Sequence, residues 1–219
     1  MTYDAVVFDN DGVLTHLTDW AIVRESIRDT FGEFGVEADD EQVEQILRAT
    51  PERVRRIAAS HDLDPHDLWA RREANAAAVQ REALETGEKP LYGDVDALRT
   101  LRDDHDLALG VVSNNQHETV QHVLSVHDVG EFFGAAYGRE PTLAGITRKK
   151  PDPHYLHRAI EDLGARRALY VGDSDSDVEA AHNAGLDSAF VRRSHRREYD
   201  LSVEPTHEIE SLRELPTLI

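Results

Sequence analysis

AVVFDNDGVLT, residues 5–15, is the stretch that decides the fold of this chain. Its first four residues are apolar, which is typical of a strand buried on both faces at the centre of a parallel sheet. The strand ends on two carboxylates, Asp9 and Asp11, and the backbone turns at Gly12, which follows them. Ligands of open α/β sheets bind at the carboxyl ends of strands, so one acid is a candidate nucleophile or metal ligand and the other a candidate proton carrier. The alternative is an acidic turn without a chemical role.

Composition narrows the classes of partner. The 219 residues carry a formal net charge of -19, which argues against nucleic acid and anionic membranes. Only three basic residues are lysines (Lys89, Lys149 and Lys150), and this excess of acid with so little lysine suggests adaptation to high salt. The absence of cysteine excludes disulfide and thiol chemistry. No stretch reaches the ~18 apolar residues of a membrane span, and Met1 leads straight into the first strand, so we expect no signal peptide and a cytoplasmic location.

The pattern becomes helical after the first strand. Apolar residues recur at steps of three and four between Val23 and Phe34, and no convincing strand occurs before residue 89. Three further helix starts carry capping residues, namely Asp39, Thr50 before Pro51, and Asp64 before Pro65. We therefore predict that residues 18–88 form a helical domain inserted into a core made of residues 1–17 and 89–219. Its tryptophans, Trp20 and Trp69, are expected to pack in the interior.

Strand and helix patterns alternate from residue 89 onward, which predicts βαβ units and a parallel sheet. Strands are expected at residues 107–112, 134–137, 168–171 and 189–191, with a short strand and helix near the C-terminus. Helices are expected at 94–103 and 117–126, then from an N-cap at Asp152, and from a capping box formed by Ser176 and Glu179. The predicted fold is α/β: a doubly wound, Rossmann-like parallel sheet with an inserted α-helical cap domain.

Polar side chains follow several of the predicted strands, and right-handed crossovers bring these strand ends to one edge of the sheet. The candidate site residues are Asp9, Asp11, Ser113, Asn114, Lys150, Asp173 and Asp177. Clustered carboxylates repel one another unless a cation lies among them, and oxygen ligands favour a hard ion, for which Mg²⁺ is the expected identity. Lys150 supplies a point charge suited to phosphate. A metal, a lysine and an aspartate nucleophile together indicate phosphoryl transfer.

Four motifs in this order resemble those of the haloacid dehalogenase (HAD) superfamily, in its phosphatase branch with an inserted helical cap. They are FDNDGVL at residues 8–14, VSN at 112–114, KPDP at 150–153, and the acidic segment VGDSDSD at 171–177. The resemblance covers residues 1 to about 18 and about 90 to 195. The helical insertion is similar only in its position and character. Val13 stands where the family usually has threonine.

The resemblance implies a role for each site residue. Asp9 would attack phosphorus and become an aspartyl-phosphate, and Asp11 would protonate the leaving oxygen and then activate water. The Asp9 carboxylate, the Asp11 backbone carbonyl and Asp173 would hold Mg²⁺. The remaining residues would act around this centre: Ser113, the Asn114 backbone N–H and Lys150 on the phosphoryl oxygens, and Asp177 on a metal-bound water or on Lys150.

The resemblance therefore implies a Mg²⁺-dependent phosphatase for a small phosphorylated metabolite, with phosphoglycolate and sugar phosphates as first candidates. A phosphosugar mutase shares every core residue and stays open as an alternative. A halogen-carbon hydrolase is disfavoured by Asp11 and the acidic fourth motif. A phospho-aspartate signalling module is disfavoured by the inserted cap, and a non-catalytic scaffold by the presence of every chemical residue. We expect a monomer or small homo-oligomer, with Lys149 and His195 as surface residues.

Overall fold

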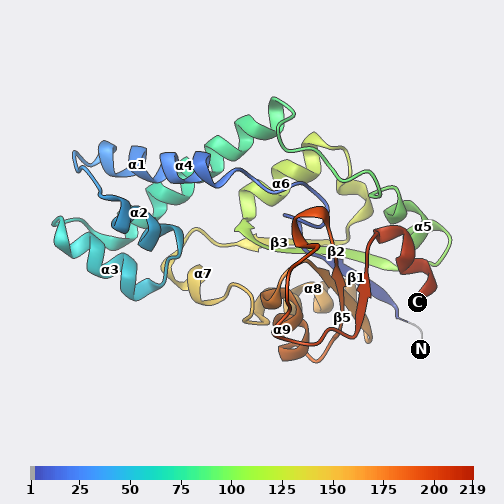
Figure 1. Ribbon diagram of the computed structural model, residues 1–219. Helices are drawn as coiled ribbons and strands as arrows, with labels where there is room; N and C mark the ends of the chain where they lie inside the picture. The colour runs from blue at the N-terminus through green and yellow to red at the C-terminus, as the bar shows by residue number, and fades with distance from the viewer. Residues whose placement is uncertain (1–2) are drawn as a thin grey trace.

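A six-stranded parallel sheet forms the centre of the molecule (Figure 1). The computed structural model describes residues 3–219. The strands lie in the order β3-β2-β1-β4-β5-β6, and their bounds are β1 Ala5–Phe8, β2 Ala108–Gln116, β3 Ala135–Arg139, β4 Ala168–Gly172, β5 Asp187–Val191 and β6 His207–Ile209. The first strand is central, with Val6 paired to Leu109 on one side and Leu169 on the other. The predicted α/β doubly wound class is confirmed.

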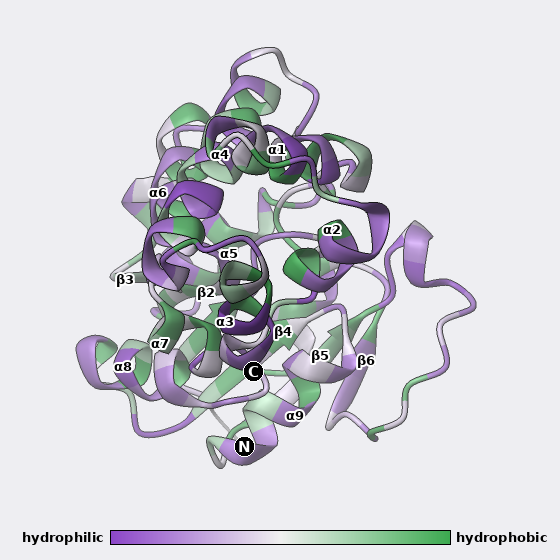
Figure 2. Ribbon diagram, turned by 90° about the vertical axis from the view of Figure 1, so that its left-hand side faces the viewer, coloured by the Kyte–Doolittle hydropathy of each residue, from purple (hydrophilic) through white to green (hydrophobic). Residues whose placement is uncertain are grey.

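Helices cover both faces of the sheet. Apolar side chains of α5 (Ala97–Asp103), α6 (His117–Val126) and the 3-10 helix η3 (Leu212–Thr217) form one buried cluster with the strands. A second cluster on the other face contains α8 (His154–Leu163) and α9 (Asp175–Asn183). Figure 2 shows the inner strands β2 and β4 mostly in the hydrophobic colour, and the edge strand β6 and the outer loops mostly in the hydrophilic colour. The sheet is therefore packed on both sides, as its apolar strands predict.

Some predicted element ends are wrong. The second strand continues past Val112 to Gln116 with an irregular register, so Ser113 and Asn114 lie inside β2 rather than after it. Helix α5 begins three residues after the predicted Asp94. Asp152 is not an N-cap: Pro153 holds that position, although Asp152 Oδ1 accepts the His154 N–H at 2.9 Å.

The capping box at Ser176 is also wrong. Helix α9 begins at Asp175 with Ser174 as its N-cap, which places Ser176 inside the helix. The Ser174 hydroxyl does not cap the helix because it donates to Asp177 Oδ2 at 2.5 Å. A local capping pattern is thus replaced by a hydrogen bond to a candidate site residue.

The helical region consists of α1 (Trp20–Glu33), α2 (Asp40–Leu47), α3 (Pro51–Ser60) and α4 (Pro65–Glu85). The three expected caps all form: Asp39 makes a capping box, and Thr50 and Asp64 accept backbone N–H bonds. These helices have a buried cluster of their own and lie beyond one edge of the sheet (Figure 1). That cluster also contains Leu143 and Ile146 of α7 (Leu143–Thr147), which follows β3. The division of the chain at residues 18 and 88 stays a prediction.

Trp20 does not pack in the interior. Helix α1 buries a stripe that begins at Val23 and continues through Ile27 and Phe31, and Trp20 lies one turn before it with 56% of its surface exposed. Trp69 is buried as expected. Two short 3-10 helices, η1 (Gly130–Phe132) and η2 (Ser194–Arg196), lie in loops. Within residues 3–219, none of the helices combines the length and apolar character needed to cross a bilayer.

Candidate active site

The carboxyl ends of β1 and β4 bring Asp9 and Asp173 together beside Asp177. Each of the three offers a carboxylate oxygen, and these oxygens lie within 4.8 Å of one another. All three residues are buried. Asp9 follows the last residue of β1, and its backbone N–H donates to the Val171 carbonyl of β4 at 2.8 Å. The pairing of β1 with β4 thus fixes Asp9 and Asp173, which directly follow these strands in the sequence.

Two glycines allow the acids to approach the backbone closely. Gly12 has a positive φ of 84°, and a Cβ atom there would lie 2.5 Å from Asp173 Oδ2. A Cβ atom on Gly172 would lie 2.1 Å from the Asp177 Cβ atom. Any side chain at either position would therefore displace a site carboxylate.

Lys150 is buried between two of these carboxylates. Its Nζ atom lies 2.9 Å from Asp9 Oδ1 and 2.5 Å from Asp177 Oδ1, and it donates to the Tyr170 hydroxyl at 2.8 Å. Burial alone would lower the pKa of Lys150, but Asp177 and Asp9 raise it, so the ammonium stays charged. Asn114 fixes this lysine from β2, because its side-chain Oδ1 accepts the Lys150 backbone N–H at 2.7 Å.

The carboxylates carry more negative charge than Lys150 offsets. Burial raises the pKa of Asp9 from 3.8 to about 8; Lys150 opposes this rise, and the charges of Asp177, Asp173 and Asp11 add to it. Among described residues, the polar partners of Asp9 contact Oδ1 and those of Asp173 contact Oδ2, which leaves one oxygen open on each. Both Asp177 oxygens already have partners, Lys150 at Oδ1 and Ser174 at Oδ2. A hard divalent cation fits this donor set, with Asp9 and Asp173 as its carboxylate ligands.

Asp11 has a buried lysine partner that the sequence analysis missed. Lys89 Nζ donates to Asp11 Oδ1, and Asn115 Nδ2 donates to Oδ2 at 3.0 Å. Burial raises the pKa of Asp11, but the charge and hydrogen bond of Lys89 outweigh this and lower it overall. Gln80 of α4 bonds both Lys89, at 3.4 Å, and Asn115, at 2.6 Å. The helical region is therefore hydrogen-bonded to the neighbours of the proposed proton carrier.

Two basic residues of η2 contact Asp173. His195 Nε2 lies 2.7 Å from Asp173 Oδ2, and Arg196 Nε donates to the same oxygen at 3.1 Å. The expectation that His195 is a plain surface residue is wrong, because the loop after β5 folds back over the strand ends. The sequence held no signal for this contact beyond the cluster of basic residues itself.

A pocket of about 300 Å³ opens above the strand ends. One part of its lining, which we name the strand-end wall, contains the predicted residues Asp9, Asp11, Ser113, Asn114 and Lys150. A second part, which we name the helical wall, contains Trp69, Arg72, Arg139 and Lys149, and Arg139 Nε donates to the Asn114 carbonyl at 3.2 Å.

Each residue of the helical wall belongs to the helical region or contacts it. Trp69 and Arg72 lie on α4, Arg139 pairs with Glu73 of α4, and Lys149 Nζ lies 3.4 Å from the Ala49 carbonyl between α2 and α3. The expectation that Lys149 is a plain surface residue is therefore wrong. The exposed Trp20 lines the same pocket.

Comparison with known families identifies the fold. A family model described as haloacid dehalogenase-like hydrolase matches residues 6–191. The chain belongs to this family. The predicted resemblance is confirmed, and with it the expectation that the protein is an enzyme of the hydrolase class.

Two relatives of this HAD-like hydrolase are named as phosphatases. Pyrophosphatase PpaX of Oceanobacillus iheyensis is 22% identical over 234 residues, covering 100% of this chain and 98% of that protein. A phosphoglycolate phosphatase of Cereibacter sphaeroides is 29% identical over 93% of this chain and 89% of its own length. The structure of CbbY from Rhodobacter sphaeroides in complex with phosphate superposes with a TM-score of 0.70 at 22% identity, covering 98% of this chain and 96% of that one. A putative beta-phosphoglucomutase of Thermotoga maritima superposes with a TM-score of 0.61 at 18% identity, over 98% and 97% of the two chains.

Proposed function

We propose that this HAD-like hydrolase is a Mg²⁺-dependent phosphatase that hydrolyses a small phosphate monoester through an aspartyl-phosphate on Asp9. The observation that carries the proposal is the placement of Asp9: it is buried, held at Oδ1 by Lys150, and lines a pocket whose volume of about 300 Å³ suits a small metabolite. The relatives named phosphoglycolate phosphatase and pyrophosphatase support phosphoryl chemistry. The CbbY structure with xylulose-1,5-bisphosphate supports a phosphorylated metabolite as substrate.

In the first half-reaction, the open oxygen of Asp9 attacks phosphorus, and the bond from phosphorus to the ester oxygen breaks. Asp11 gives its proton to that leaving oxygen. In the second half-reaction, Asp11 removes a proton from a water molecule, which attacks the aspartyl-phosphate, so that inorganic phosphate leaves and Asp9 is restored. Lys89 favours the ionised form of Asp11, which suits the second step.

The remaining strand-end residues hold the transferred group. Lys150 lies within reach of both Asp9 and a phosphoryl oxygen beside it, and Ser113 and the Asn114 N–H line the same pocket. Mg²⁺, held by Asp9, Asp173 and the Asp11 backbone carbonyl, would supply positive charge that offsets the carboxylates and the phosphoryl oxygens. Asp177 positions Lys150 through their ion pair.

A phosphate-release assay over a substrate panel tests the proposal. The panel contains phosphoglycolate, pyrophosphate, sugar phosphates and sugar bisphosphates, each with Mg²⁺, with excess EDTA, and with Ca²⁺. We expect release with Mg²⁺, loss in EDTA, recovery on adding Mg²⁺, and inhibition by Ca²⁺, whose looser coordination misplaces the nucleophile. Full activity in EDTA contradicts the metal assignment. An isomerised sugar phosphate without released phosphate supports the mutase alternative, and no turnover of any substrate contradicts the enzyme proposed.

A further inference from the structure

The helical wall contains three cations, Arg72, Arg139 and Lys149, and the two arginines contact a single carboxylate. Arg72 Nη1 lies 2.5 Å from Glu73 Oε1, and Arg139 Nη2 donates to the same oxygen at 3.1 Å. Arg139 Nη1 also lies 2.7 Å from Glu73 Oε2, as an ion pair without hydrogen-bond geometry. In the described part of the chain, Glu73 is the one carboxylate that pairs with either arginine. Two of the three positive charges are therefore uncompensated.

These cations are also buried and incompletely bonded. The side chains of Arg72 and Arg139 are each 8% exposed, and Arg72 Nε has no hydrogen-bond partner among the described residues. The Lys149 ammonium, which is half-buried, has the Ala49 carbonyl at 3.4 Å. Burial lowers the pKa of Lys149, and the charges of Arg139 and Arg72 lower it further. Buried positive charge without a partner is costly, so this wall is suited to receiving an anion.

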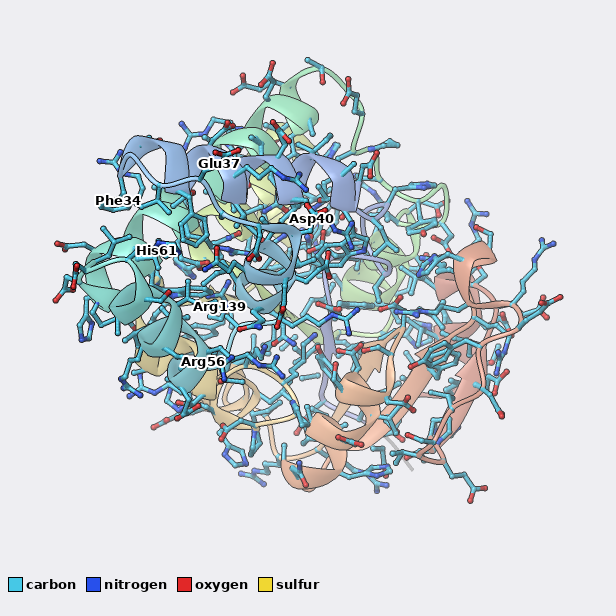
Figure 3. All side chains as sticks on the ribbon, turned by 60° about the vertical axis from the view of Figure 1, so that its left-hand side comes forward. Phe34, Glu37, Asp40, Arg56, His61 and Arg139 are labelled. Atoms are coloured by element: carbon cyan, nitrogen blue, oxygen red, sulfur yellow. The ribbon has the colours of Figure 1, made fainter. Side chains whose placement is uncertain are left out.

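The arginines are held in place by Trp69. The guanidinium carbons of Arg72 and Arg139 lie 5.1 Å and 5.2 Å from the centre of its ring. Figure 3 shows Arg139 between the helical region and the sheet, whereas Arg56 lies out on α3. The whole chain has a net charge of -19, so a buried positive cluster here does not follow from a basic composition. Cations packed on an aromatic ring form a preorganised binding surface.

We propose that the helical wall binds a second anionic group of the substrate, so that the enzyme selects phosphate monoesters that carry a carboxylate or a second phosphate. This inference rests on the proposed function, because the first phosphate is placed at Asp9 and Lys150. Lys149 Nζ is the donor to the second group, and the charges of Arg72 and Arg139 lie behind it in the same lining. Apolar side chains of Val23, Leu47 and Ile146 also line the pocket and suit a short carbon chain between the two anions.

Matched substrate pairs test this selectivity. Phosphoglycolate is compared with 2-hydroxyethyl phosphate, and propane-1,3-diol bisphosphate with 3-hydroxypropyl phosphate, so that the two pairs separate carboxylate from phosphate. In at least one pair, we expect kcat/KM to be about 10- to 100-fold higher for the member with a second anionic group than for the member with a hydroxyl in its place. This is the range of a hydrogen bond to a charged group. Equal values within both pairs overturn the inference while leaving the proposed phosphatase intact.

Lys149→Gln is the decisive variant, because Lys149 makes no ion pair in the described chain and its loss leaves the arginines in place. It should lower kcat/KM about tenfold for the members with a second anionic group, mainly through KM, and leave the members with a hydroxyl in its place unchanged. Lys149→Arg should restore most of the difference. Arg53→Gln is the matched control, since Arg53 is an exposed cation near Lys149 that does not line the pocket. An equal loss of kcat/KM for substrates with and without the second anionic group overturns the assignment of Lys149.

Binding without turnover provides an independent readout. Both tryptophans, Trp20 and Trp69, line the pocket, so their fluorescence reports its occupation. Titration of Asp9→Asn should give at least tenfold tighter binding of phosphoglycolate or the bisphosphate than of the matching hydroxyl analogue. Lys149→Gln in that background should remove the difference. Such a preference, together with a wild-type enzyme that releases no phosphate from any substrate, keeps the inference and contradicts the proposed function. Equal binding, or no binding, overturns the inference.

Discussion

The two walls of the pocket carry opposite charge and are built differently. The strand-end wall has carboxylates beside Lys150, and its residues lie on or just after β1 and β2, except Lys150, which follows α7. The helical wall is dominated by cations beside a single carboxylate, and its residues come from α4, the end of β3 and the loop after α7. The strand-end wall is suited to a metal ion and the helical wall to an anion. The backbone positions the first, whereas side-chain packing positions the second.

The largest expected loss of activity comes from a substitution in the strand-end wall. Asp9→Asn should lower phosphate release at least about a thousandfold for every substrate, because losing a nucleophile typically costs several orders of magnitude. The control is thermal melting in EDTA. Because folding raises the pKa of Asp9 from 3.8 to about 8, the unfolded chain ionises first, and this residue lowers the free energy of unfolding as pH rises through that range. The variant should therefore melt no lower than the wild type, and its stability relative to the wild type should increase from pH 3.8 to about pH 8. Retention of more than about a hundredth of the activity contradicts the covalent route.

Breaking the helical wall should instead affect stability. Glu73→Gln leaves two buried guanidinium groups without their carboxylate, so the free energy of unfolding should fall by about 3–5 kcal/mol. Glu33→Gln is the matched control, since Glu33 pairs with Arg71 on the exposed surface and its loss should cost less than about 1 kcal/mol. Chemical denaturation of both variants measures the difference. Equal, small effects would show that the helical wall does not depend on its buried ion pairs.

Lys89 connects Asp11 of the strand-end wall to Gln80 of α4, and its loss should have an intermediate effect on catalysis. Lys89→Met removes the charge that keeps the pKa of Asp11 low, so this pKa should rise. Because the second half-reaction needs ionised Asp11, the acidic limb of the kcat–pH profile should move to higher pH, and kcat should fall about 10- to 100-fold. Thr18→Val is the control, as it removes a 3.0 Å hydrogen bond to Lys89 but no charge. An unmoved acidic limb would separate Lys89 from the chemistry.

The smallest expected effect is that of salt. Both walls are buried, so added KCl should screen mainly the surface carboxylates, with a Debye length that falls from ~10 Å at 0.1 M to ~3 Å at 1 M. The melting temperature and kcat/KM should rise together between low and molar KCl, at fixed free Mg²⁺, because repulsion within the acidic chain and against the anionic substrate both decrease. A flat or falling melting temperature contradicts the proposed adaptation to high salt. That result would not contradict the description of either wall.

The strand-end wall could be predicted because an apolar run followed by an acid reports both a buried strand and its end. Asp9 and Asp173 each follow such a run, and parallel pairing brings them together. The helical wall could not be predicted, because Arg72 lies in a helix where many positions are arginine, alanine or glutamate. Periodicity shows which face of a helix is buried, but not which loop it meets. Lys89 was missed for the same reason: its partner Asp11 is 78 residues away.

The buried cluster of the helical region includes Leu143 and Ile146, which lie outside the predicted insertion of residues 18–88. If the chain divides as predicted, the insertion is not a self-contained module. Its excision would strip the cover from two apolar side chains in the segment that leads to Lys149 and Lys150. A chimera that exchanges this insertion with that of a relative would need to carry residues 143–147 along with it. Evolution of substrate preference in this chain is accordingly expected to change the two segments in concert.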